Sequence, residues 1–208
     1  MMKRAVPLII LCLMAGLAAP RAGSFELSPF YGYRLGGDFD DVPSSVITEL
    51  EIQNSDSYGL TFGYAFNDRF ELEGLWSIQE SDLDIFLAAG PTQTIGFEVQ
   101  YFHVGGLVLS GDSLDTKRGF FSFSAGVVSF DPEGAKDETY FSWSIGGGGK
   151  FYFNDWLGLR LQGRFFPTYI NSTSSGYFCG FYGCYETADA NFLTQTEFTA
   201  GLIFRFGY

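Results

Sequence analysis

The chain is poor in positive charge and in histidine, and each shortage argues against a class of function. It has 12 Lys and Arg residues against 24 Asp and Glu residues, a formal net charge of −12. Such acidity argues against nucleic acid or another polyanion as a partner. His103 is the only histidine, which leaves little for acid–base catalysis at neutral pH.

Long apolar segments are also scarce. The clearest apolar run, Ala5–Ala19, follows a basic start and leads into small residues. It is too short for a good membrane-spanning helix, which needs about 20 apolar residues. The pattern predicts a secretory signal peptide over residues 1–22, cleaved after Ala22, with a site near Ala18 as the alternative. The mature domain is then 23–208, with 9 basic residues against 24 acidic ones.

Cysteine is rare as well. Of three cysteines, Cys12 lies in the predicted signal, which leaves Cys179 and Cys184 in Cys-Gly-Phe-Tyr-Gly-Cys. An even pair in an exported chain predicts a disulfide, here one that closes a small loop. A metal site would need further ligands nearby, and the sequence places none there. No metal or other cofactor is expected.

Glycine and aromatic residues, by contrast, are abundant. The chain has 27 glycines, and 19% of its residues are aromatic. They recur with a period of two, which predicts β-strands. Eight such segments follow the signal, over about residues 25–36, 57–66, 69–79, 95–110, 118–130, 139–153, 156–168 and 191–208.

The connections between these strands alternate in length. Short ones lie at Asn67-Asp68, 111–117 and Asn154-Asp155; longer ones, acidic or rich in Ser, Gly and Asn, lie at 37–55, 80–94, 131–138 and 169–190. This alternation is typical of an up-and-down barrel whose rims face different compartments, with both ends of the chain at the short-turn rim. The expected fold is all-β, an eight-stranded antiparallel up-and-down barrel.

The two faces of the predicted strands differ in polarity. In the last strand, Phe198, Leu202 and Phe206 share an apolar face. The opposite faces of the strands carry the charges Glu71, Glu73, Glu98, Lys150, Arg160, Arg164, Glu197 and Arg205. A soluble barrel would be apolar inside and polar outside. An apolar exterior with a charged lumen predicts a transmembrane β-barrel.

The signal, the eight strands, the unequal rims and the closing strand Phe198–Tyr208 together resemble a known group. They are similar to the small outer-membrane β-barrels of Gram-negative bacteria, the OmpA, OmpX and OmpW-like proteins. The resemblance implies export through the periplasm to the outer membrane, where lipid surrounds the barrel. It also implies that Phe206 and Tyr208 belong to the signal read by the barrel-assembly machinery during biogenesis.

The charged lumen has two interpretations. Eight strands enclose a space just wide enough for side chains to fill, and buried charges must be paired. We therefore predict a network of ion pairs that plugs the lumen; the alternative is a narrow polar channel. Glycines at 146–149, Gly59 and Gly63 predict bent, tightly packed strands or, alternatively, a lateral opening for apolar molecules.

The long connections are the candidates for contact with an extracellular ligand or surface partner. The aromatic residues around the cysteine pair are Tyr177, Phe178, Phe181, Tyr182 and Tyr185. They are predicted either to be exposed anchors or to pack as a lid over the barrel mouth. Acidic residues in the first and third long connections suggest a solvated rim or sites for divalent ions, although no segment has calcium-loop spacing.

His103 lies inside a predicted strand, deeper than the base of a rim hydrolase or protease would lie. It is interpreted as a packed residue, and the chain is not expected to be an enzyme. The predicted function is a structural or interactive role at the cell surface, carried by the long acidic loops. The alternative is a narrow pore or conduit for small solutes or apolar molecules.

Overall fold

A computed structural model describes residues 23–39, 47–87, 91–111, 115–133, 137–170, 177–180, 183–186 and 192–207. The eight long strands are β1 (Ser24–Leu35), β4 (Ser55–Ala65), β5 (Phe70–Leu87), β6 (Gln93–Leu109), β7 (Lys117–Pro132), β8 (Glu138–Tyr152), β9 (Leu157–Tyr169) and β12 (Phe192–Phe206). The short strands are β2 (Asp38–Phe39), β3 (Ile47–Ile52), β10 (Tyr177–Gly180) and β11 (Gly183–Glu186). In these residues no helix is long and apolar enough to cross a membrane.

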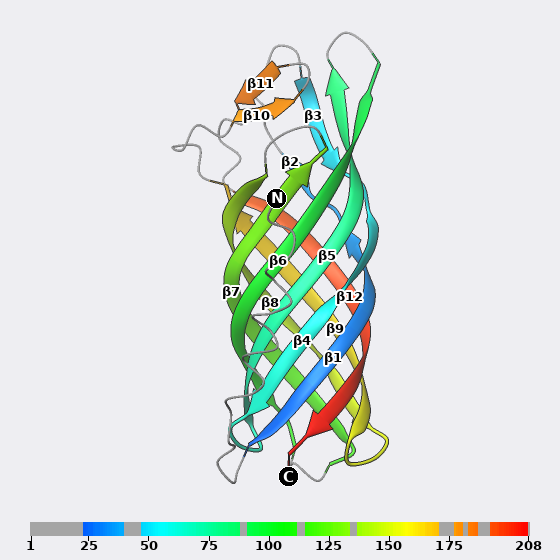
Figure 1. The fold of residues 1–208 in the computed structure, drawn as a ribbon, viewed down its shortest axis with the longest axis vertical. Coiled ribbons are helices and arrows are strands. Elements are labelled where there is room, and N and C mark those ends of the chain that lie inside the picture. Colours follow the sequence, from blue (N-terminus) through cyan, green and yellow to red (C-terminus); the bar gives the residue numbers. More distant parts are fainter. Residues whose placement is uncertain are drawn as a thin grey trace, which may run out of the picture.

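The eight long strands close into an antiparallel barrel (Figure 1). Each pairs with the next long strand along the chain, and β1 pairs with β12, from Phe25 opposite Phe206 to Leu35 opposite Thr196. Closure leaves no strand edge exposed around the wall, as a barrel in lipid requires. The predicted fold class is confirmed, with one long strand for each predicted strand.

Two of the short turns at one end of the barrel share a local motif. Asn67 Oδ1 accepts hydrogen bonds from the backbone N–H groups of Arg69 and Phe70, each at 2.9 Å. Asn154 Oδ1 accepts in the same way from Trp156 at 3.1 Å and Leu157 at 2.8 Å. An asparagine side chain that caps backbone donors a few residues ahead stabilises a tight turn. The start of β1 and the end of β12 lie at this same end (Figure 1).

At the opposite end the sheet continues beyond the closed barrel. β5 runs on to Leu87 and β6 starts at Gln93, so the prediction of a loop over residues 80–94 was largely wrong. The acidic residues Glu80, Asp82 and Asp84 occupy alternate positions, with Ser81 and less polar residues between them, which is a strand pattern. The segment was predicted as a loop because its composition is acidic. β3 pairs with the outer part of β5, β2 pairs with β3, and β10 and β11 form a separate hairpin (Figure 1).

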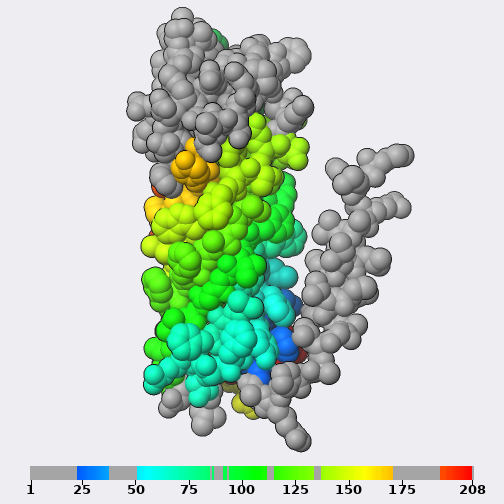
Figure 2. Space-filling view, turned by 90° about the vertical axis from the view of Figure 1, so that its left-hand side faces the viewer, coloured from blue at the N-terminus to red at the C-terminus, as the bar shows by residue number. Residues whose placement is uncertain are grey.

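The outward-facing side chains of the barrel are mostly apolar and exposed. Large hydrophobic residues between 37% and 63% exposed occur on all eight long strands, among them Phe70, Phe102, Phe141, Leu161 and Phe198. The strands form a continuous wall around the cylinder, seen from one side in Figure 2. So large an apolar surface is stable against lipid rather than against water.

Inward-facing glycines let the strands pack closely inside the wall. A Cβ atom at Gly59, Gly126 or Gly148 would overlap the backbone of the neighbouring strand. Only glycine permits such an approach, so these positions allow the sheet to coil into a narrow barrel. This geometry supports the first of the two predicted roles for glycine, tight packing of bent strands.

Candidate functional site: the interior of the barrel

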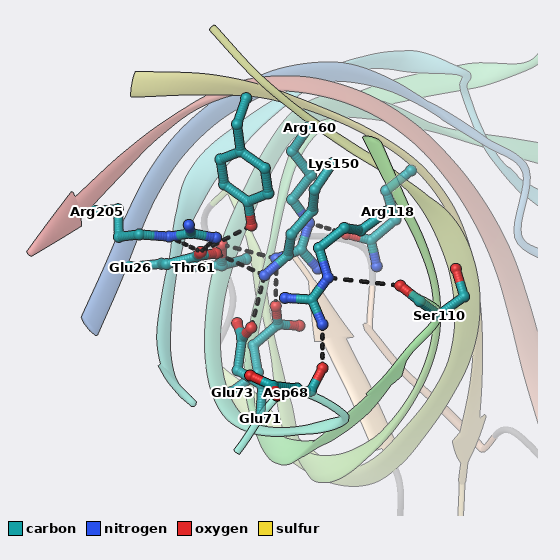
Figure 3. A network of polar contacts seen from close by, with 12 residues as sticks. Glu26, Thr61, Asp68, Glu71, Glu73, Ser110, Arg118, Lys150, Arg160 and Arg205 are labelled. Atoms are coloured by element: carbon teal, nitrogen blue, oxygen red, sulfur yellow. Dashed lines mark hydrogen bonds and ion pairs between the residues drawn. The ribbon is translucent and has the colours of Figure 1, made fainter. Parts of the chain in front are cut away.

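Paired charges cross the lumen near the short turns (Figure 3). Lys150 Nζ lies 2.6 Å from Glu26 Oε2 and 2.7 Å from Glu71 Oε2. Tyr152 donates its hydroxyl to Glu26 Oε1 at 2.8 Å, and Arg205 Nη2 lies 2.9 Å from the same oxygen. These contacts tie together β1, β5, β8 and β12 across the interior.

Glu73 forms a second group of ion pairs. Its two carboxylate oxygens lie 2.5 Å from Arg160 Nη1 and 2.6 Å from Arg164 Nη2. Arg164 also donates to Ser124 Oγ at 3.3 Å, and the Arg160 guanidinium lies 4.6 Å from the centre of the Phe120 ring. Glu73 therefore bridges β5 to β9 through two charge-assisted contacts, which are stronger than neutral hydrogen bonds.

Arg34 marks the outer limit of the charged region. Its side chain is fully buried, and its Nη2 lies 2.6 Å from Glu197 Oε1. Ser77 accepts a hydrogen bond from the same nitrogen and donates one to Glu197 at 2.8 Å. The guanidinium also lies 4.8 Å from the Tyr101 ring centre and 5.4 Å from that of Phe166. It thus has a carboxylate on one side and an aromatic layer on the other.

The outer end of the lumen is apolar. A contiguous cluster of buried residues fills it: Ile52, Leu75, Leu83, Phe97, Val99, Tyr101, Val128, Phe130, Phe166, Ile170 and Leu193. We call this set the outer apolar cluster. Its residues come from β3, β5, β6, β7, β9 and β12 and from Ile170, which directly follows β9. Sequence reasoning missed this cluster for two reasons. Ile52, Leu83 and Ile170 fell in predicted connections, and only charged and polar residues were assigned to the inner face of the strands.

Glu98 lies on the outer face of β6, so the prediction that it faces the lumen was wrong. Its neighbours Phe97 and Val99 are 3% and 0% exposed and point inward. The Glu98 side chain is half-buried and accepts a hydrogen bond from Gln100 at 2.5 Å. Glu80 lies opposite it in the ladder, also on the outside, and accepts from Tyr58 at 2.9 Å. The polarity of the strands inverts at this level.

The other predicted lumen charges are brought together inside the barrel. They are Glu71, Glu73, Lys150, Arg160, Arg164, Glu197 and Arg205, and each forms an ion pair. Sequence reasoning missed two further members, Glu26 and Arg34. Both lie at even positions of β1, on one face with Ser28, and this alternation is the signal that identifies them.

His103 is buried in the lumen, and the Ser124 hydroxyl beside it also accepts a hydrogen bond from Arg164. Its Nδ1 lies 3.3 Å from Ser124 Oγ, and its ring lies beside those of Tyr101 and Phe166. A base for catalysis needs a substrate within hydrogen-bonding reach. The side chain is only 2% exposed, and this environment supports its interpretation as a packed residue.

A cavity of about 570 Å³ lies at the short-turn end. Glu26, Glu71, Arg118 and Arg205 contribute to its lining, so it borders the paired charges. Arg118 extends from β7 to the backbone carbonyl of Asp68 in the β4–β5 turn (Figure 3). Among the described side chains, no group of three or more His, Cys, Asp or Glu could hold a metal ion.

The predicted loop residues lie only partly within the described residues. Cys179 lies opposite Cys184 in the β10–β11 ladder, and Phe178 lies opposite Tyr185. The disulfide between the two cysteines remains a prediction. Tyr177 starts β10. Phe181, Tyr182, Tyr208 and the predicted signal peptide lie outside the described residues, whereas Phe206 is exposed at the end of β12.

Solved structures with a similar fold are small outer-membrane barrels. The outer membrane protein OprG from Pseudomonas aeruginosa has a TM-score of 0.60 and 11% identity, with 90% of this chain and 98% of that chain covered. Neisserial surface protein A has a TM-score of 0.55 and 11% identity, with 88% and 97% covered. The N-terminal beta-barrel domain of Pseudomonas aeruginosa OprF has a TM-score of 0.50 and 15% identity, with 88% and 97% covered.

No protein-family model matches the chain, and no curated protein matches it. At identities this low, the structural similarity concerns the fold alone. At that level, the resemblance to small outer-membrane barrels predicted from the sequence is confirmed.

Proposed function

We propose that the chain is a closed outer-membrane barrel that anchors its long connections at the cell surface and does not conduct solutes. The observation that carries this proposal is that two successive layers occlude the lumen beyond the cavity at the short-turn end. Paired charges form the first layer, and the outer apolar cluster fills the opposite end.

The ion pairs support a closed interior because they join strands on opposite sides of the barrel. Glu73 on β5 holds Arg160 and Arg164 on β9, and Lys150 on β8 holds Glu26 on β1. Opening a water path along the axis requires these contacts to separate. Removing one partner of a buried pair costs about 3–5 kcal/mol, so a spontaneous opening would be rare.

The outer apolar cluster supports the same conclusion by a different mechanism. Phe130 and Phe166 are fully buried, and each lies against another aromatic ring of the cluster. A narrow constriction lined by such residues excludes water and therefore ions. A polar channel would need hydrophilic groups at this level, where the inward positions are mainly apolar or aromatic.

The outer end of the molecule supports a role in surface contact. Beyond the wall, the β5–β6 hairpin has Glu80, Asp82 and Asp84 at alternate positions, and Glu98 faces outward beside them. A projecting, acidic sheet is well solvated and can meet other molecules without disturbing the barrel. The buried position of His103 supports a function without catalysis.

The test is conductance in planar lipid bilayers with the purified, folded chain. We expect no sustained single-channel currents, because the ion pairs and the outer apolar cluster block the lumen beyond the cavity. The double variant Phe130→Ala/Phe166→Ala shortens the aromatic plug and should increase brief openings. Phe141→Ala, which shortens an outward-facing residue, is the matched control and should leave the baseline unchanged. Steady currents through the unaltered chain would overturn the proposal in favour of a narrow pore.

A further inference from the structure

The contact between β1 and β12 differs from every other contact in the barrel wall. All other neighbouring long strands are joined by a connection in the chain, which restricts how they can slide against each other. β1 and β12 are the first and last long strands, and the residues that meet between them are as much as 181 positions apart, from Phe25 to Phe206. The register of this closing contact must come from the side chains.

Two ion pairs lie directly across this closing contact. In the ladder, Glu26 is the register partner of Arg205, and Arg34 is the register partner of Glu197. Both pairs face the lumen, with distances of 2.9 Å and 2.6 Å between the charged atoms. The other ion pairs of the described residues, such as Arg160 with Glu73, join strands that are not neighbours.

The spacing of these charges is compatible with a single register. A slip of one residue would turn one strand inside out. A slip of two residues preserves the faces but places Arg34 opposite Gln195 or Thr199, and Glu26 opposite Ile203 or past the end of β12. Either slip leaves all four charges without their partners in the ladder, and a buried unpaired charge is costly.

We propose that Glu26–Arg205 and Arg34–Glu197 form a register lock, which selects the pairing of β1 with β12 when the barrel closes. The shear of a closed barrel is set by this last contact, so the lock also fixes the strand tilt and the width of the lumen. The cross-lumen pairs stabilise the closed barrel but do not select its register.

The lock can be tested by reversing one of its pairs. Arg34→Glu places two carboxylates opposite each other, whereas Arg34→Glu with Glu197→Arg restores opposite charges in the native register. The swap suits the surroundings, because Ser77 and Gln79, which contact Arg34, can donate hydrogen bonds as well as accept them. The control is Glu73→Gln, which removes two buried cross-lumen ion pairs and no pair of the lock.

Disulfide trapping in the outer membrane reads the register directly. In a chain with all three cysteines replaced by serine, Tyr31→Cys/Ala200→Cys reports the native register, because these outward positions are opposite each other. Tyr31→Cys with Phe198→Cys or Leu202→Cys reports slips of two residues in either direction. Folded barrel is measured as the band that migrates differently before and after heating on a gel.

We expect Arg34→Glu to lower the native cross-link in the membrane fraction by about tenfold, with slipped or unfolded chain in its place. The double swap should restore both the native cross-link and the folded band. Glu73→Gln should lower thermal resistance while the chain that folds keeps the native cross-link. The proposal is overturned if the double swap is no better than the single reversal. It is equally overturned if the single reversal keeps the native register, or if Glu73→Gln slips as readily as Arg34→Glu.

Discussion

The lipid-facing part of the barrel and its outer extension are built from the same strands with opposite polarity. On β5, Glu71 and Glu73 point into the lumen while Leu72 faces out; further along, Leu83 points inward while Asp82 faces out. The strand keeps its period of two throughout. What changes is the solvent outside the barrel, from lipid to water, so the outward-facing residues change from apolar to polar. The inward-facing residues change in the opposite direction, from charged to apolar.

The two parts are therefore stabilised by different forces. In the lipid-facing part, folding gains little from burying the outer apolar surface against other protein, and buried ion pairs hold the strands across the lumen. Such pairs are sensitive to the loss of one partner. In the outer part, the apolar cluster resembles the core of a soluble barrel and depends on burial and packing.

Among the variants that test this comparison, Glu73→Ala is expected to lower the free energy of unfolding most. The change leaves the guanidinium groups of Arg160 and Arg164 buried without their carboxylate. We expect the free energy of unfolding to fall by about 4–5 kcal/mol, because two buried cations lose their partner. Urea unfolding in lipid vesicles measures it. Glu98→Ala, on the outer face, is the control. An equal loss of unfolding free energy there would mean that the ion pairs in the lumen stabilise the barrel no more than a charge on its outer face does.

A smaller loss of unfolding free energy is expected when a side chain of the outer apolar cluster is truncated. Phe130→Ala removes a fully buried ring that packs against Phe97 and Tyr140. Such a deletion should lower the free energy of unfolding by about 3–4 kcal/mol through lost burial and a cavity. The same unfolding assay applies, and Phe141→Ala is the matched outward control. A loss below that of the control would argue against a soluble-type core in this part.

The smallest of the three effects is expected for a charge placed on the outward face of the barrel, at two different levels. Leu161→Arg places a charge among lipid-facing residues and should lower the free energy of unfolding by about 2–3 kcal/mol. Ser129→Arg places the same side chain on the outer face of β7, near the level where the polarity has inverted, and should change it by less than about 0.5 kcal/mol. Equal losses at the two positions would mean that lipid extends over the outer part as well.

The architecture was predictable because it depends on local patterns. Alternation of side chains identified the eight strands, and the Asn-Asp pairs identified two tight turns. Seven of the eight proposed lumen charges were also assigned to the correct face. Glu98 was not, because the rule that charged residues face inward holds only within lipid, and the sequence carries no mark of where the lipid ends.

By itself the sequence determined the period of each strand, and therefore which residues can share a face. Only the tertiary structure decided which of those faces meets lipid, water or the opposite wall at each level. It also decided that Glu73 is shared by two arginines and that Arg34 lies opposite Glu197. These contacts join residues far apart in the chain, and they form only when the sheet closes with its strands tilted. Neither closure nor tilt is encoded in any single strand.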